Sequence, residues 1–161
     1  MSNETKIVKD PSGRKLIVTR SFDASLDKVW QAWTESALLE KWWAPKPYKA
    51  ETKIMDFSVG GLWLYAMVSP EGEKHWCRVD FKTIDTGKSY TASNGFCDED
   101  GNMNNDFPIM QWENQFAGAG DKTNVIVELT FESEEELEKI VAMGFKEGFS
   151  MALGNLDELL A

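Results

Sequence analysis

The stretch SEEELEKIVAMGFKEGFSMALGNLDELLA, residues 133–161, decides the fold of this chain. Ser133 followed by Glu136 is a capping box, in which each side chain bonds a backbone N–H that lacks a helical partner. Apolar residues then recur every three or four positions, which is the spacing of one buried helix face. They are Leu137, Val141, Phe145, Phe149, Leu153 and Leu156. The stretch therefore predicts one long amphipathic helix.

A strip of very small residues runs beside this apolar stripe. It consists of Gly144, Gly148 and Ala152. Glycine inside a helix costs about 1 kcal/mol relative to alanine. Two glycines on one face therefore indicate that something comes close to the helix backbone, and this is either a sheet or a ligand.

The rest of the chain reads mainly as strands. β-Branched and aromatic runs bounded by turn residues predict strands at residues 16–22, 52–57, 62–69, 74–84, 89–97, 110–117 and 124–131. Two short helices are expected after the first strand, one capped by Ser25 and one over residues 36–43, and Pro45 and Pro47 end the second. The fold class is α+β, with a curved antiparallel sheet of about seven strands wrapped around the long C-terminal helix.

Length and composition indicate one soluble domain. A chain of 161 residues buries about 70% of its unfolded surface, so it forms a core without disulfides or a structural metal. We expect residues 1–14 to be a flexible lead-in and residues 15–161 to be a single domain. Seven Trp and nine Phe make the interior aromatic; composition alone leaves open whether these rings fill the core or line a pocket.

Charge and motif content exclude several classes of function. The formal net charge of −10 argues against nucleic acid and anionic membrane surfaces as partners. No apolar run is long enough to span a bilayer, and the polar N-terminus lacks the apolar stretch of a signal peptide. Cys77 and Cys97 have no metal-ligand spacing, and we interpret them as reduced thiols of a cytoplasmic protein.

Four motifs, in order, resemble a known family. They are FDASLDKVWQAWTESALLEKWWAP (22–45), FSVGGLW (57–63), the PEGE turn (70–73) and MGFKEGFSMALGNLDELL (143–160). In order and spacing they resemble the START-like, or SRPBCC, superfamily, and locally its subgroup of homologues of the activator of a heat-shock chaperone ATPase. The resemblance implies a helix-grip fold with a hydrophobic cavity between sheet and helix. It further implies lipids, sterols, polyketides or similar molecules as ligands, and cyclase-type enzymes in some members.

The candidate ligand-binding residues come from the aromatic motifs, one strand pair and the terminal helix. Trp42-Trp43-Ala44-Pro45 resembles the family's Trp-Trp-Gly-Pro segment near the cavity mouth. The same sequence is also consistent with two tryptophans that pin a short helix to the core. Alternation places Trp63, Tyr65 and Met67 on one strand face, which we take as the concave one. The full set is Trp30, Trp42, Trp43, Trp63, Tyr65, Met67, Arg78, Phe145, Gly148, Phe149 and Ala152.

Polar candidates for catalysis are few. Arg78 and Asp80 share a strand face and would form a polar pair inside the cavity, unless that face is the solvated one. Glu113 would be a general acid or base with a raised pKa if it faced inward, and a solvated carboxylate otherwise. His75, the only histidine, follows a turn and is expected to be exposed. Residues 98–109 lack the Gly and Glu of a calcium loop; we expect no metal and no cofactor.

Three hypotheses follow. The favoured one is a binding protein for a small hydrophobic or aromatic molecule. The second is a cyclase- or hydrolase-type enzyme that uses the same cavity. The third is a chaperone-associated stress-response protein acting through its surface; a chaperone partner is disfavoured because the founding activator carries this module within a longer protein. A homodimer through a sheet edge or the aromatic segment is a further alternative.

Overall fold

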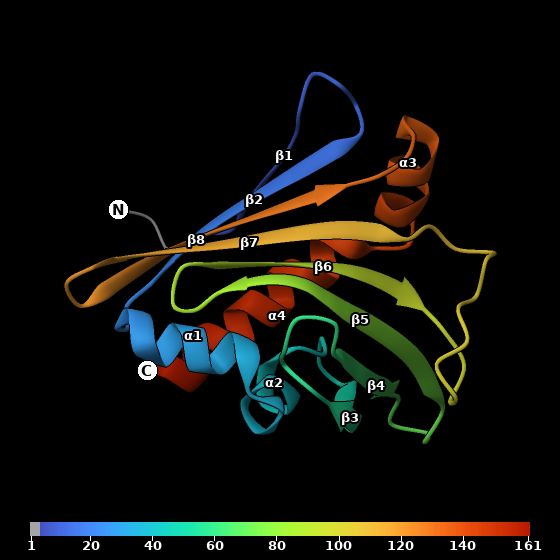
Figure 1. The fold of residues 1–161 in the computed structure, drawn as a ribbon, viewed down its shortest axis with the longest axis horizontal. Helices are drawn as coiled ribbons and strands as arrows, with labels where there is room; N and C mark the ends of the chain where they lie inside the picture. The colour runs from blue at the N-terminus through green and yellow to red at the C-terminus, as the bar shows by residue number, and fades with distance from the viewer. Residues whose placement is uncertain (1–3) are drawn as a thin grey trace.

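A computed structural model describes residues 4–161, and it shows an α+β, helix-grip fold (Figure 1). Over these residues the chain forms eight strands and four helices. The strands are β1 Lys6–Lys9, β2 Lys15–Phe22, β3 Lys49–Met55, β4 Leu62–Val68, β5 Lys74–Asp85, β6 Ser89–Phe96, β7 Met110–Ala119 and β8 Lys122–Thr130. The helices are α1 Leu26–Thr34, α2 Ser36–Trp42, α3 Glu134–Ala142 and α4 Phe145–Leu160.

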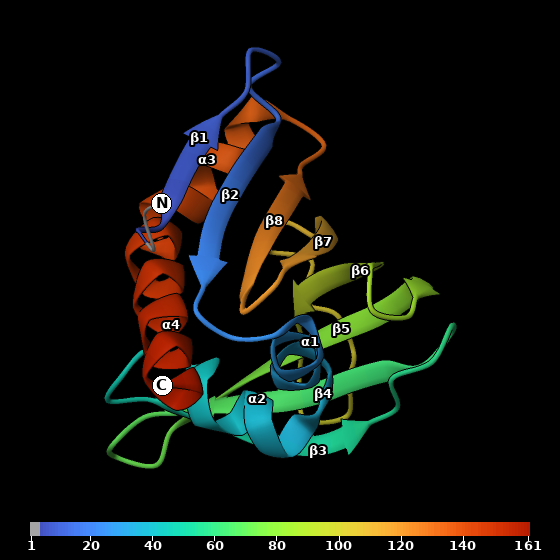
Figure 2. The ribbon, with the colours of Figure 1, turned by 90° about the vertical axis from the view of Figure 1, so that its left-hand side faces the viewer.

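All strands belong to one antiparallel sheet in the order β1-β2-β8-β7-β6-β5-β4-β3. Strands from opposite ends of the chain meet in it, since Leu16 of β2 pairs with Leu129 of β8. The sheet bends into a deep curve, and α4 lies across its open side (Figure 2). The right-handed twist of neighbouring strands produces this curvature.

The sheet has one strand more than the sequence predicts. Lys6–Lys9 forms β1, an edge strand that pairs with β2 through Ile7↔Val18 and Val8↔Ile17. The flexible lead-in predicted for residues 1–14 is therefore corrected over Lys6–Lys9, which pair with β2 and of which Ile7 lies partly buried. Its first three residues lie outside the described part of the chain.

The two short helices form where the sequence predicts them. Ser25 caps α1, and its Oγ accepts a hydrogen bond from the backbone N–H of Lys28 at 3.4 Å. The helix α2 follows after one residue and ends three residues before Pro45. Both helices pack inside the curve of the sheet (Figure 2).

The C-terminal segment is two helices, and the prediction of one long helix is wrong at a single point. Ser133 Oγ accepts from the N–H of Glu136 at 3.2 Å, so the predicted cap is present. The helix then stops at Ala142, and Gly144 takes a left-handed φ of 93° before α4 begins. Glycine adopts this conformation at no steric cost. Gly144 is thus the break between two helices and not part of a small-residue helix face.

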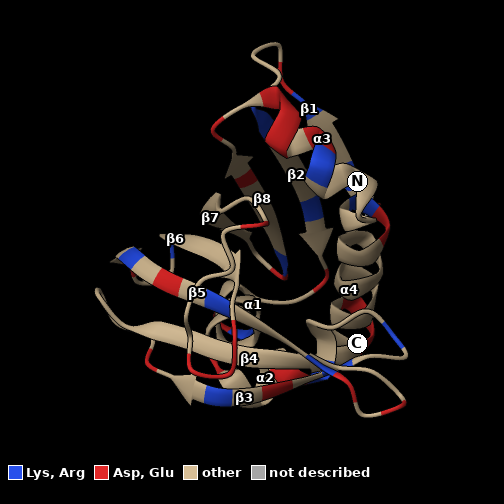
Figure 3. Cartoon of the chain, turned by 90° about the vertical axis from the view of Figure 1, so that its right-hand side faces the viewer, with Lys and Arg blue, Asp and Glu red and all other residues tan. Residues whose placement is uncertain are grey.

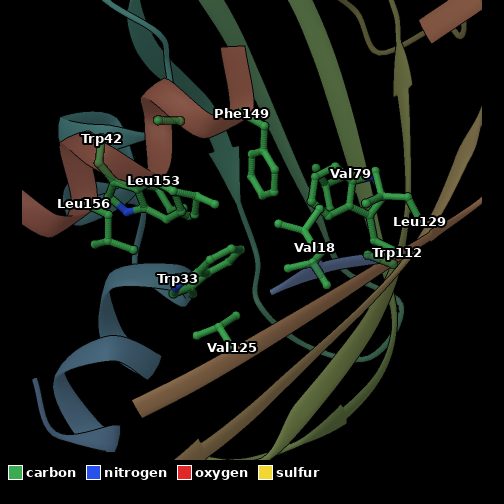
Figure 4. Close-up of a cluster of buried hydrophobic side chains, with 14 of the residues drawn as sticks. Val18, Trp33, Trp42, Val79, Trp112, Val125, Leu129, Phe149, Leu153 and Leu156 are labelled. Atoms are coloured by element: carbon green, nitrogen blue, oxygen red, sulfur yellow. The ribbon is translucent and has the colours of Figure 1, made fainter. Parts of the chain in front are cut away.

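The core joins the concave sheet face to α1, α2 and α4 (Figure 4). Trp33, Trp42, Leu153 and Leu156 fill the space between the helices, and all four are at most 2% exposed. Within residues 4–161, no helix combines the length and the apolar character that crossing a membrane requires.

The helix break generates a prediction about stability. Gly144→Ala should lower the free energy of unfolding by about 1–2 kcal/mol, because an L-residue is strained at positive φ. An added Cβ would meet no atom within 4 Å, so the loss comes from the backbone alone. Gly154→Ala in α4 is the matched control: it also meets no atom, and it should stabilise by up to ~1 kcal/mol. Urea denaturation measures both, and equal or higher stability of Gly144→Ala would contradict the assignment.

Candidate functional site

A pocket lies between the concave face of β4–β7 and the junction of α3 and α4. Its volume is about 440 Å³, above the ~300 Å³ at which small-molecule pockets begin. Its wall is mostly apolar and rich in rings, and Figure 4 shows Phe149, Val79 and Trp112 facing one another at its inner end. The Trp, Tyr, Phe and Met side chains in the wall are Trp43, Tyr48, Tyr65, Met67, Phe96, Met110, Trp112, Met143, Phe145 and Phe149.

Trp43 stands at the centre of this wall. It follows the last residue of α2, and its Nε1 donates a hydrogen bond to Tyr65 Oη at 2.7 Å. Its ring meets those of Trp112 and Phe149 at centroid distances of 5.8 and 6.0 Å. The Trp43 indole at the end of α2 therefore contacts both the sheet and α4, and it is partly exposed to the pocket.

Seven of the predicted ligand-binding residues belong to the pocket wall. Met67 and Tyr65 face it from β4, which agrees with the concave face predicted for that strand. Gly148 faces it from α4, and a Cβ built there would lie 3.4 Å from Pro45 Cγ. The seven are Trp43, Tyr65, Met67, Arg78, Phe145, Gly148 and Phe149.

Four predicted residues lie outside this wall, three of them in the core and Trp30 packed against it. Trp42 is fully buried and donates from Nε1 to the carbonyl of Ala32 at 2.9 Å, which is the helix-pinning role. Trp63 stacks on Tyr65 with ring centroids 3.9 Å apart. The other two are Trp30, which packs among Phe57, Tyr90 and Phe116, and Ala152, which is 2% exposed.

Arg78 contributes to the wall without turning its charge into the pocket. It pairs with Leu64 across the strands, so its side chain shares the outer face with that residue. The guanidinium bonds Asp80 Oδ1 from Nε at 3.0 Å and the Gly101 carbonyl from Nη1 at 3.1 Å. Charged and uncharged residues alternate along β5 (Figure 3). The Arg78–Asp80 pair therefore lies on the outer face and not in the cavity.

Glu113 also lies on the outer face of the sheet. It is exposed and stands between Thr91 and Glu128 on the neighbouring strands. Because side chains alternate along β7, Trp112 and Asn114 on either side of it point inward. Two orientations were considered for Glu113, and the strand register gives the solvated one. Glu113 therefore does not reach the pocket as a general acid or base.

Sequence reasoning missed several residues of the wall, most of all those of β5 to β7. Cys77 and Val79 alternate with Arg78 and so face inward, and Asn94 and Trp112 do the same on β6 and β7. The alternation that places Tyr65 on the concave face could have found Cys77, since the two residues pair across the strands.

The polar side chains that face the pocket from the sheet include a thiol, a phenol, an amide and an indole. Burial raises the pKa of the Cys77 thiol to about 12 and the pKa of Tyr65 well above its usual value. Asn94 Oδ1 and Trp112 Nε1 are buried and have no hydrogen-bond partner in the described protein. His75 stands exposed at the mouth, 6.3 Å from the Tyr48 ring. The site can hold an uncharged molecule and offers it hydrogen bonds.

Metal-ligand chemistry has no support among residues 4–161, where no three His, Cys, Asp or Glu side chains gather at one point. Cys77 and Cys97 are free thiols. Asp98, at the start of the rejected calcium loop, accepts from the backbone N–H groups of Asp100 and Asn102, both at 2.9 Å. These bonds lower the pKa of Asp98 and make the segment a hairpin tip.

Comparison with known proteins identifies relatives along nearly the whole chain. A model of the family described as Activator of Hsp90 ATPase homolog 1-like protein matches residues 23–161. Protein Ms6760 from Mycobacterium smegmatis is 31% identical, with a TM-score of 0.89 over 98% of this chain and 96% of its own. A protein from Arthrobacter aurescens is 30% identical, with a TM-score of 0.90 over 96% and 90%. A protein from Staphylococcus epidermidis is 26% identical, with a TM-score of 0.83 over 96% and 93%. No curated protein matched the chain.

The half-buried thiol of Cys77 generates a prediction about reactivity. At pH 8 the Cys77 thiol should stay protonated, because its pKa is about 12. Since the thiolate is the nucleophile, iodoacetamide should modify Cys77 at least about a hundred-fold more slowly than free cysteine. The measurement uses a Cys97→Ala background, so that mass spectrometry follows one thiol. The same chain in urea should react at the ordinary rate, and rapid labelling of the folded protein would contradict the burial.

Proposed function

Because the chain belongs to the family of Activator of Hsp90 ATPase homolog 1-like proteins, we propose that it binds a small hydrophobic or aromatic molecule between its sheet and its C-terminal helices. The supporting observation is the pocket of about 440 Å³ with aromatic rings on both walls. Trp112 and Phe149, which both border it, contact each other edge to face with ring centroids 5.4 Å apart. Such rings offer a flat apolar molecule a large contact area.

The positions of the polar residues favour binding over the enzyme alternative. That alternative requires Glu113, Arg78 or Asp80 to reach the cavity, and the strand registers place all three on the outer face. The groups that do face the pocket include a tyrosine and a thiol whose pKa values are raised by burial. Neither group is ionised near neutral pH, which is unsuited to acid–base or nucleophilic work.

Among residues 4–161, the exposed apolar side chains do not gather into one patch that would favour the chaperone-associated alternative. Large apolar side chains that stand exposed come from separate elements, such as Val8 of β1, Ile54 of β3 and Met151 of α4. Tyr48 and Met143, which are also exposed, belong to the pocket wall. A chaperone partner and a homodimer thus stay predictions without a defined surface.

Filling the pocket from α4 tests the proposal. The neutral fluorophore N-phenyl-1-naphthylamine should bind the parent protein with a rise in fluorescence. Gly148→Leu should weaken this binding at least about tenfold, because Gly148 lies on the wall and any side chain there extends beside Pro45 into the pocket. Fluorescence titration measures the dissociation constant.

Gly154→Leu is the matched control for this substitution. It makes the same exchange in the same helix, at a position with no atom within 4 Å of an added Cβ and away from the pocket. Its binding should equal that of the parent. Unchanged binding by Gly148→Leu, or equal losses in both variants, would refute a ligand site at this pocket.

A further inference from the structure

We propose that the pocket selects neutral molecules that carry a hydroxyl group on an aromatic or similarly apolar body, and that Asn94 and Trp112 bind this hydroxyl. The inference rests on the proposed binding function and specifies the ligand class. It assigns the body of the ligand to the aromatic wall and its polar end to the two side chains.

The primary observation is a pair of buried polar atoms without partners. Asn94 is 8% exposed and Trp112 is 4% exposed, and both belong to the pocket wall. The amide Oδ1 of Asn94 and the indole Nε1 of Trp112 form no hydrogen bond in the described protein. Buried polar atoms are nearly always paired, so each unpaired one requires an explanation.

The strand register brings the two side chains together. Asn94 pairs with Met110, and Trp112, two residues further along β7, pairs with Ala92. The two are therefore diagonal neighbours on the inner face, and such neighbours lie about 7–8 Å apart, within reach of long side chains. One functional group of a ligand can contact both.

The chemistry of the two atoms selects a hydroxyl. An indole N–H only donates and an amide oxygen only accepts, whereas a hydroxyl both accepts and donates. A ketone or ether would satisfy Trp112 and leave Asn94 unpaired. The rings of Trp43 and Phe149 flank Trp112 at 5.8 and 5.4 Å, so the apolar body of the ligand would contact them.

The charge of the wall argues against acidic ligands. A buried carboxylate needs a paired cation, and Arg78, the one Arg or Lys of the wall, turns its guanidinium to Asp80 on the outer face. His75 is exposed at the mouth, away from the inner end. The net charge of −10 repels anions further.

Bound water is the competing explanation. A smaller space of about 20 Å³ is bordered by Asn94, Trp112, Trp33 and Asn114, and all four carry an unpaired buried atom. Such a volume holds about one water molecule. Asn94 and Trp112 differ from the other two because they border the large pocket as well. A permanent water on them would remove any preference for a hydroxyl, so ligand binding decides between the two explanations.

The experiment compares naphthalene, 2-naphthol and 2-naphthoate at pH 7, where the naphthol is neutral and the naphthoate ionised. Titration calorimetry or displacement of N-phenyl-1-naphthylamine gives each dissociation constant for the parent protein. 2-Naphthol should bind about tenfold or more tightly than naphthalene, since its hydroxyl fills two unmet hydrogen bonds. 2-Naphthoate should bind more weakly than 2-naphthol.

Variants then assign the preference to its residues. Asn94→Leu and Trp112→Phe should each remove most of the affinity ratio of 2-naphthol over naphthalene, with both dissociation constants measured on the same variant. Asn114→Leu and Trp76→Phe are the matched controls. Asn114 borders only the small space, and Trp76 lies on the outer face of β5, paired with Ala66. Both controls should keep the preference.

The outcomes separate this inference from the function on which it rests. Equal affinity for naphthalene and 2-naphthol, or tighter binding of 2-naphthoate, overturns the hydroxyl site and leaves ligand binding in place. A preference that survives in Asn94→Leu and Trp112→Phe also overturns it. Failure of all three compounds and of N-phenyl-1-naphthylamine to bind overturns the proposed function itself, and the inference with it.

Discussion

The packing of Trp43 is the interaction on which the rest of the interior depends. Its indole donates to Tyr65 Oη at 2.7 Å and so ties the end of α2 to the sheet. Around it stand the rings of Trp33, Trp42, Trp63, Trp112 and Phe149, at centroid distances between 5.3 and 6.1 Å. Edge-to-face contacts of this kind fix both separation and orientation. Trp43 therefore sets how far α4 stands from the sheet, and the pocket is the space that this separation leaves.

The periodic spacing of apolar residues in the sequence predicted most of the fold. Alternation located the strands from β2 to β8, and the Ser133 cap located the start of α3. The break at Gly144 has no periodic signal, because a glycine that costs stability in a helix and a glycine that ends one read alike in sequence. The edge strand β1 was missed since its charged sequence KIVK depends on pairing with β2 and not on its own propensity.

The site was harder to predict than the fold, and adjacent tryptophans show why. Trp42 and Trp43 have the same chemistry, yet one is fully buried against Ala32 and the other lines the pocket. Which of them faces the cavity follows from where α2 ends against α4, and that is a tertiary property. Strand faces posed the same problem: alternation groups Arg78 with Asp80 correctly, but only the register against β4 shows that this group faces outward.

The pairing of β2 with β8 has a consequence for how the protein is made. Their ladder runs from Lys15↔Thr130 to Phe22↔Thr123, so each pair in it joins residues at least 101 positions apart. Synthesis proceeds from the N-terminus. The edge of β2 that faces away from β1 therefore has no partner strand until β8 leaves the ribosome. Closing so large a loop costs entropy before any contact compensates it. The nascent chain therefore carries an incomplete sheet until β8 has emerged, and the ladder between β2 and β8 forms only after that.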